Sequence, residues 1–245
     1  MTTNISAPQK LYLLQLSTTT IPGATRTLEM ALGCYLIEAG DGKHILIDSG
    51  FPPDVAPPPG TPPAENEKNV IEHLAALGLQ PDDIDMLICT HFDIDHVGYH
   101  DAFTKAELVV QREHYTLARS GHPRFAAARA HWDHPALHYR LLDGDTEILP
   151  GLTLLETSGH TSGHQSVLLR LPQTGPVLLA IDAVMLQLAF TPDRVAWPMD
   201  ENQEQLRAST RKLLDLVERE QVALVIFGHD GQQWKTLKKA PEYYG

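Results

Sequence analysis

Four short apolar segments of this chain each lead into a histidine or an aspartate, and this arrangement limits the possible folds more than any other feature. The segments and the polar residues after them are 86–90 with His91, 152–157 with His160, 176–181 with Asp182, and 222–227 with His229. Runs of this length and composition predict buried strands. Loops at strand ends are where α/β enzymes place their reactive groups. We therefore expect an α/β fold with a polar site at one edge.

The other segments predict strands and helices around these four. Apolar runs predict strands at 11–16, 32–39, 44–48, 107–111 and 166–171, helical spacing predicts helices at 69–79 and 201–220, and 112–141 reads as mostly helical with breaks at Pro123 and Pro135. The stretch 51–65 holds seven prolines and is expected to form a surface loop over a site. The order of elements is compatible with two sheets packed face to face with helices outside, although other α/β arrangements also fit it.

Size and charge restrict the class of protein. A chain of 245 residues is expected to form one domain, residues 1–245, and its net charge of −12 argues against nucleic acid and anionic membranes as partners. Two cysteines in apolar runs, Cys34 and Cys89, are expected to be buried and reduced. Neither a signal peptide nor a membrane span is recognisable, so we expect a cytoplasmic protein, while export of a processed chain stays open.

The segment 90–96 reads Thr-His-Phe-Asp-Ile-Asp-His and contains the potential metal ligands His91, Asp93, Asp95 and His96. Alone, this string is also explained as a polar loop with aspartates that cap a helix. The Gly-His pairs at 159–160 and 228–229 favour a metal site, because histidine is the commonest metal ligand and these histidines follow other strands.

These motifs resemble the metallo-β-lactamase superfamily, whose signature is HxHxDH, then GHxxGH, an aspartate at a strand end and a final histidine. Within it the sequence is most similar to N-acyl-homoserine lactonases, as seen at 46–50, 157–172, 178–183 and 228–245. The resemblance covers about residues 11–245. It implies an αββα sandwich, in which two mixed β-sheets are flanked by helices.

The resemblance also implies a binuclear metal centre and supplies its ligands. The first metal would take His91, Asp93, His160 and Asp182, and the second would take Asp95, His96, Asp182 and His229. Asp182 would bridge both ions. Asp48 would orient a ligand by hydrogen bonding, and His164 would have a supporting role. Zinc is the metal implied by the family, with manganese or iron as alternatives because of Asp93.

The sequence departs from the family at two positions. Asp93 stands where the family has histidine. Its negative charge would lower the net charge of the centre, counted over two divalent ions, a bridging hydroxide and the ligand carboxylates, from +1 to zero. The rival interpretation is that Asp93 points away and the first metal is weak or absent. Met185 stands where the lactonases usually have a tyrosine that polarises the carbonyl, and methionine donates no hydrogen bond.

Function follows from the resemblance as an expectation. The chain would be a quorum-quenching, metal-dependent hydrolase that opens N-acyl-homoserine lactones or related lactones with a metal-bridging hydroxide, while Asp95 carries the proton to the leaving oxygen. A thioester hydrolase like glyoxalase II and a phosphodiesterase remain alternatives, although the loops at 91–100 and 158–165 lack a lysine or arginine for phosphate. The expected partner is a small lactone, and the oligomeric state, including a homodimer, stays open. A pocket-lining role for His100 also stays open. For His131, His134 and His138 we favour an exposed or loop-proximal face, because Pro135 falls among them, with a further metal site as the alternative.

Overall fold

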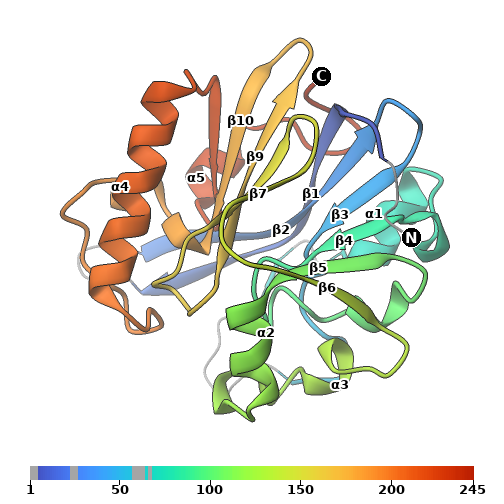
Figure 1. Cartoon of the computed structure of the whole chain (residues 1–245), viewed down its shortest axis with the longest axis horizontal. Coiled ribbons are helices and arrows are strands. Elements are labelled where there is room, and N and C mark those ends of the chain that lie inside the picture. The colour runs from blue at the N-terminus through green and yellow to red at the C-terminus, as the bar shows by residue number, and fades with distance from the viewer. Residues whose placement is uncertain (1–4, 23–26, 57–63, 66–67) are drawn as a thin grey trace.

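Two mixed β-sheets lie face to face in the computed structural model, which describes residues 5–22, 27–56, 64–65 and 68–245 (Figure 1). One sheet has the strand order β1 (Pro8–Pro22), β2 (Thr27–Ala39), β3 (His44–Ile47), β4 (Met86–Ile88), β5 (Glu107–Gln111) and β6 (His138–Leu142). The other has the order β11 (Leu224–Phe227), β10 (Gly175–Ile181), β9 (Gln165–Leu171), β8 (Leu152–Glu156) and β7 (Thr146–Leu149).

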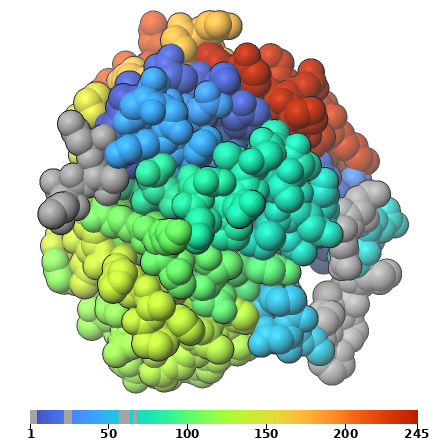
Figure 2. Space-filling model, turned by 90° about the vertical axis from the view of Figure 1, so that its right-hand side faces the viewer, coloured from blue at the N-terminus to red at the C-terminus, as the bar shows by residue number. Residues whose placement is uncertain are grey.

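Helices cover the outer faces of both sheets. They are α1 (Val70–Ala76), α2 (Arg112–Arg119) and α3 (Arg129–Trp132) by the six-stranded sheet, and α4 (Gln203–Arg219) by the five-stranded one, with α5 (Gly231–Trp234) packed on β2. Figure 2 shows the outer face of the six-stranded sheet, where the turquoise segment that contains α1 covers the centre.

Side-chain alternation along the strands explains the layers. Leu13 lies in the core between the sheets, whereas its neighbour Leu14 lies in the core under α1 to α3. In β10, Leu179 faces the inter-sheet core and Leu178 faces α4. Because both faces of these strands are buried, their sequences read as continuous apolar runs. The predicted αββα sandwich is confirmed.

The predicted helices at 69–79 and 201–220 are confirmed, with slightly different ends. Asn69 caps α1 by accepting from the Glu72 N–H, and the Glu72 carboxylate accepts from the Asn69 N–H. Asn202 caps α4 by accepting from the N–H groups of Glu204 and Gln205.

The prediction of mostly helical structure over 112–141 is wrong at its end, because residues 138–142 form β6 parallel to β5. Tyr139 and Leu141 of β6 pack against the outer core, and the Tyr139 hydroxyl donates to the Trp132 carbonyl. Pro135 ends the helical structure before this strand. β7 was not predicted. Residues 57–63 of the proline-rich stretch lie outside the described residues.

The last residues of the chain connect the two sheets. The N–H groups and carbonyls of Leu11 and Tyr244 bond reciprocally at 2.8 and 2.9 Å, and the Thr174 N–H donates to the Gly245 carbonyl. Cys34 and Cys89 are buried free thiols, as predicted. Among the described residues, no helix combines the length and apolarity that a membrane span needs.

Candidate metal centre

The strand ends converge because of the sheet topology. β10 and β11 are parallel with Ile181 opposite Phe227, so Asp182 and His229 leave the sheet at the same end. The Ala31 N–H donates to the His229 carbonyl and the Gln165 N–H to the Thr90 carbonyl, so these bonds link the two sheets beside the site.

Seven side chains form three overlapping clusters in which the potential ligand atoms lie within 4.8 Å of one another. We name them the first cluster (His91, Asp93 and His160), the central cluster (His91, His96 and Asp182) and the second cluster (Asp95, His96 and His229). These are the seven residues that the resemblance implied as ligands, and Asp93 faces into the site. Its Oδ2 lies 3.0 Å from His160 Nε2 and 3.4 Å from His91 Nε2.

The spacing of these atoms fits divalent metals. A carboxylate oxygen of Asp182 lies 3.1 Å from His229 Nε2, 3.6 Å from His96 Nε2 and 3.4 Å from His160 Nε2. Ligands at about 2.0–2.2 Å from a zinc ion lie about 3–4 Å apart. The buried atoms His91 Nε2, His96 Nε2 and Asp182 Oδ1 have no hydrogen-bond partner, which is unusual for buried polar groups and indicates a ligand.

Electrostatics lead to the same conclusion. Burial would lower the pKa of His96, but the carboxylates of Asp95, Asp182 and Asp48 raise it to about 10. Burial would raise the pKa of Asp182, but His229 and His96 hold it well below its usual range. The negative potential at the centre therefore favours cations.

Asp48 fixes the ring orientation of His91 and His96 in the loop that follows β4. Its Oδ1 accepts from the Thr90 N–H at 2.8 Å, and its Oδ2 lies 2.6 Å from Thr90 Oγ1 and 2.8 Å from His96 Nδ1. Thr90 Oγ1 is in turn 3.0 Å from His91 Nδ1. Such contacts leave the Nε2 atoms of both histidines facing the site.

His164 supports Asp182 and belongs to none of the three clusters. The Asp182 N–H donates to His164 Nε2 at 3.3 Å, and His164 Nδ1 lies 2.9 Å from Thr157 Oγ1. Burial, followed by the neighbouring histidines, keeps the pKa of His164 well below its usual value, so the ring is neutral and can accept.

Local backbone geometry brings the ligands together. Ile181 has φ 51°, an unfavourable left-handed conformation for a β-branched residue, immediately before Asp182. A side chain at Gly228 would lie 2.6 Å from the Ile181 carbonyl oxygen, and one at Gly159 would lie 2.3 Å from the Leu206 nitrogen. Glycine before each histidine therefore permits the close approach of neighbouring backbone.

Three residues around the centre were not predicted. Asp200 Oδ1 lies 2.8 Å from His160 Nδ1, and His114 joins the two motif loops, since its Nε2 accepts from the Phe92 N–H and its Nδ1 bonds the Ser162 carbonyl. Arg124 reaches Asp93 and His160 from the turn Pro123–Phe125. Each is distant in sequence from its partner and belongs to no motif, so no local sequence signal predicts these contacts.

Arg124 places a positive charge at the centre. No lysine or arginine stands in the motif loops at 91–100 and 158–165, but the fold brings the Arg124 guanidinium to the centre from outside them. Its Nε donates to Asp93 Oδ1 at 2.5 Å, and its Nη2 donates to Asp93 Oδ2. Although burial would raise the pKa of Asp93, its hydrogen bonds with the Arg124 guanidinium hold it well below its usual range.

Two candidate residues remain, Met185 and His100. Met185 packs in a small apolar cluster with Met30 and Leu186. His100 is fully buried with its Nδ1 2.7 Å from Ser49 Oγ, so it lines no open pocket.

His131, His134 and His138 do not share one helix face. His131 lies in α3 and bonds Asp54 and Asp101 at 2.8 and 2.9 Å, whereas His138 begins β6. Among the described residues, His134 and His138 enter no metal-binding group. The alternative of a further metal site there finds no support in this geometry.

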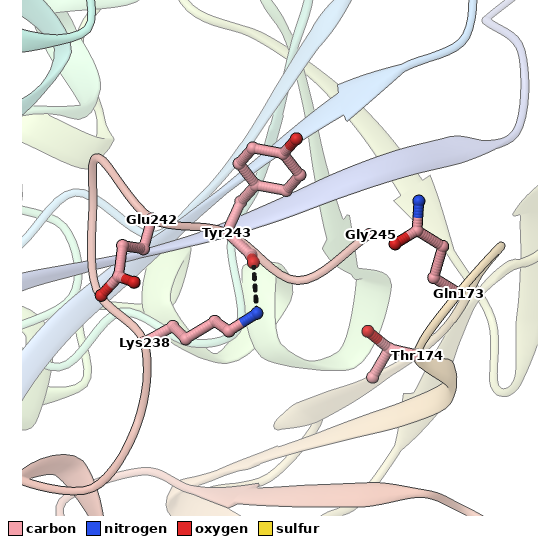
Figure 3. A pocket seen from close by; sticks show the side chains of 6 residues that line it. All are labelled: Gln173, Thr174, Lys238, Glu242, Tyr243 and Gly245. Carbon is pink, nitrogen blue, oxygen red and sulfur yellow. Dashed lines mark hydrogen bonds between the residues drawn. The ribbon is translucent and has the colours of Figure 1, made fainter.

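A pocket of about 350 Å³ opens at the C-terminal tail, and its lining shares no residue with the three clusters (Figure 3). Lys238 donates there to the Tyr243 carbonyl at 3.3 Å. The chemistry of the site therefore lies in the clusters at the strand ends.

Comparison with known proteins identifies the class first. The model of the Metallo-beta-lactamase superfamily matches residues 34–229, the region that holds the strand ends and all seven clustered side chains. The αββα layers and this match define a protein of that superfamily.

Relatives within the superfamily are similar over most of the chain. An N-acyl homoserine lactonase from Bacillus sp is 32% identical, with 93% of this chain and 91% of the relative covered. N-acyl homoserine lactonase AttM of Rhizobium johnstonii is 32% identical, with 88% of each covered. A solved N-acyl homoserine lactone hydrolase with the product N-hexanoyl-L-homoserine at its catalytic metal center has a TM-score of 0.83 at 30% identity, covering 97% of this chain and 100% of that one. The chain belongs to the metallo-beta-lactamase superfamily and, within it, to the N-acyl homoserine lactonase family.

Proposed function

We propose that this protein is a metal-dependent, quorum-quenching hydrolase that opens the lactone ring of N-acyl-homoserine lactones. The convergence of seven histidine and aspartate side chains at the sheet edge supports this most directly. The product-bound relative, solved with N-hexanoyl-L-homoserine at its metal center, supports the substrate class.

The metal ligands are those of the clusters. His91, Asp93 and His160 would hold one divalent ion, Asp95, His96 and His229 would hold the other, and Asp182 would contact both. Bound ions of zinc, manganese or iron would polarise the lactone carbonyl and supply hydroxide near neutral pH. The work left to the chain is to fix the ligands and to move one proton.

Asp95 is the residue we assign to proton transfer. Its side chain is 25% exposed, whereas that of Asp182 is 5% exposed and surrounded by histidines. Asp95 Oδ2 lies 3.8 Å from His96 Nε2 and 3.7 Å from His229 Nε2, so these rings hold the carboxylate beside the site while solvent and substrate can reach it. A carboxylate so placed can receive a proton and pass it to the oxygen that leaves the ring.

Met185 donates no hydrogen bond at the position where the lactonases usually have a tyrosine, so bound ions would supply the polarisation of the carbonyl. Arg124 does not turn the site into one for phosphodiesters, because Asp93 holds its Nε and the carbonyls of Met199 and His160 hold its Nη1.

The test compares substrates on metal-loaded protein. We expect ring opening of N-acyl-homoserine lactones, with a thioester and bis(p-nitrophenyl) phosphate turned over much more slowly. Faster cleavage of either alternative substrate would contradict the proposal.

A variant tests the role of Asp95. Asp95→Asn should lower kcat by about 10²–10⁴-fold at full metal content. Asp82→Asn, at an exposed ion pair with Lys105, is the matched control. Near-normal turnover of metal-replete Asp95→Asn would show that the proton travels by another group.

A further inference from the structure

The guanidinium of Arg124 bonds the same atoms that the first cluster would offer to a metal. Its Nη2 donates to Asp93 Oδ2 and lies 2.9 Å from His160 Nε2. An arginine nitrogen has no lone pair to offer, so His160 presents its own lone pair to this N–H. A metal ion at the first cluster needs that lone pair as well.

Among the described residues, no lysine or arginine bonds the side chains of the second cluster. The side-chain bonds and ion pairs of Asp95, His96 and His229 are with one another, with Asp48 and Asp182, and with the Ala31 carbonyl. The two halves of the centre therefore differ in whether a cation of the protein already holds the ligand atoms.

Arg124 is held by contacts that would survive the release of Nη2. Its Nε donates to Asp93 Oδ1, and its Nη1 donates to the Met199 carbonyl at 2.6 Å and lies 3.4 Å from Glu201 Oε1. The guanidinium is a rigid plane, so Nη2 leaves only by a small shift of the whole group, which the Nε and Nη1 contacts limit. The side chain is 18% exposed, so it is not fully enclosed. Asp93 would then keep Oδ1 on Arg124 and give Oδ2 to the metal.

Charge explains why the two residues occur together. Asp93 brings one negative charge where the family has a neutral histidine, and Arg124 brings one positive charge in direct contact with it. The pair has the same net charge as the histidine, so the sum at the centre returns from zero to +1.

We propose that Arg124 is a positioning residue that holds Asp93 in the first cluster and competes with the metal there, so that the second cluster fills first. This rests on the proposed metal centre. The ion of the first cluster binds only when Nη2 leaves Asp93 and His160. The affinity of the first cluster for its ion is therefore lower by the free energy of those contacts. Charge-assisted hydrogen bonds of this kind correspond to about tenfold or more in an equilibrium constant.

The experiment is a metal titration of the apoprotein with Co²⁺, by calorimetry and by competition with a chelator, followed through the visible absorption of bound Co²⁺. We expect two unequal steps in the wild type. Arg124→Gln should tighten the weaker step by about tenfold and leave the stronger step unchanged. Arg112→Gln, at the exposed ion pair with Asp143, removes the same charge elsewhere and should change neither step.

Three outcomes would overturn the proposal. They are two equal steps in the wild type, a weaker step that is unchanged in Arg124→Gln, and a weaker step that becomes weaker still, which would mean that Arg124 only supports the ligand. Absence of Co²⁺ binding in the wild type would refute the metal centre itself, and this inference with it. Two unequal steps without lactone turnover would refute the proposed substrate and leave the role of Arg124 standing.

Discussion

Replacing Asp48 by asparagine should weaken both metal sites without changing the shape of the protein. Asp48 has φ 58°, a conformation that asparagine adopts readily. The Thr90 N–H donates to Oδ1 at 2.8 Å and requires an acceptor, so the amide oxygen takes that place and the NH₂ takes the place of Oδ2. There it faces His96 Nδ1 and Thr90 Oγ1, which now have to accept.

The substitution changes the preferred proton position on two histidines, His96 and His91. In the wild type, Asp48 accepts from His96 Nδ1–H and from the Thr90 hydroxyl, whose oxygen accepts from His91 Nδ1–H, so both Nε2 atoms keep a lone pair for metal. In Asp48→Asn each donor is reversed, and the favoured proton position becomes Nε2. Restoring the ligating tautomer leaves donors facing each other, at a cost of about 1–3 kcal/mol per ring. This predicts metal affinity about 10–100-fold lower at each site.

The assay is the same Co²⁺ titration, together with ¹⁵N NMR of the imidazole nitrogens in zinc-loaded protein to identify the tautomers. Asp85→Asn is the matched control, because Asp85 accepts from the His44 N–H at 3.0 Å and asparagine can do the same there. A folded Asp48→Asn that binds both ions within about threefold of wild type would refute the tautomer argument.

Three further changes test other parts of the structure. Asp200→Asn should lower the metal affinity of the first cluster alone, by about 10–100-fold, because the Trp197 N–H fixes the amide oxygen and turns the NH₂ towards His160 Nδ1. Equal weakening of both steps in the Co²⁺ titration would argue against this. Gly33→Ala should lower the free energy of unfolding in urea by about 1–3 kcal/mol, since the new Cβ would lie 2.1 Å from Trp234, and an unchanged value would contradict the packing. Burial opposes protonation of His131, but Asp101 and Asp54 raise its pKa. The stabilisation from this ion pairing is therefore complete below the unfolded-state pKa and is lost as pH rises through the folded-state pKa. The difference in unfolding free energy between wild type and His131→Gln should shrink from pH 6 to pH 9.

Much of the fold was predictable because its signals are local. Continuous apolar runs predicted the strands that are buried on both faces, and helical spacing predicted the helices at 69–79 and 201–220, in which Asn69 and Asn202 prove to be the N-caps. β6 was misread as helix, because its half-buried residues lack both a continuous apolar run and clear alternation. Its state is decided by pairing with β5, which a local pattern does not contain.

The motifs by themselves determined which residue types stand at the strand ends, since spacing along the chain fixes what a loop can present. Only the tertiary structure decided what surrounds them. Asp200 reaches His160 across 40 positions, and Arg124 reaches Asp93 across 31. Such contacts depend on where separate loops meet at the sheet edge, and no local periodicity encodes that meeting. Asp93 is accordingly a departure from the family's motif in the sequence, whereas in the fold it is one half of a charge-balanced pair.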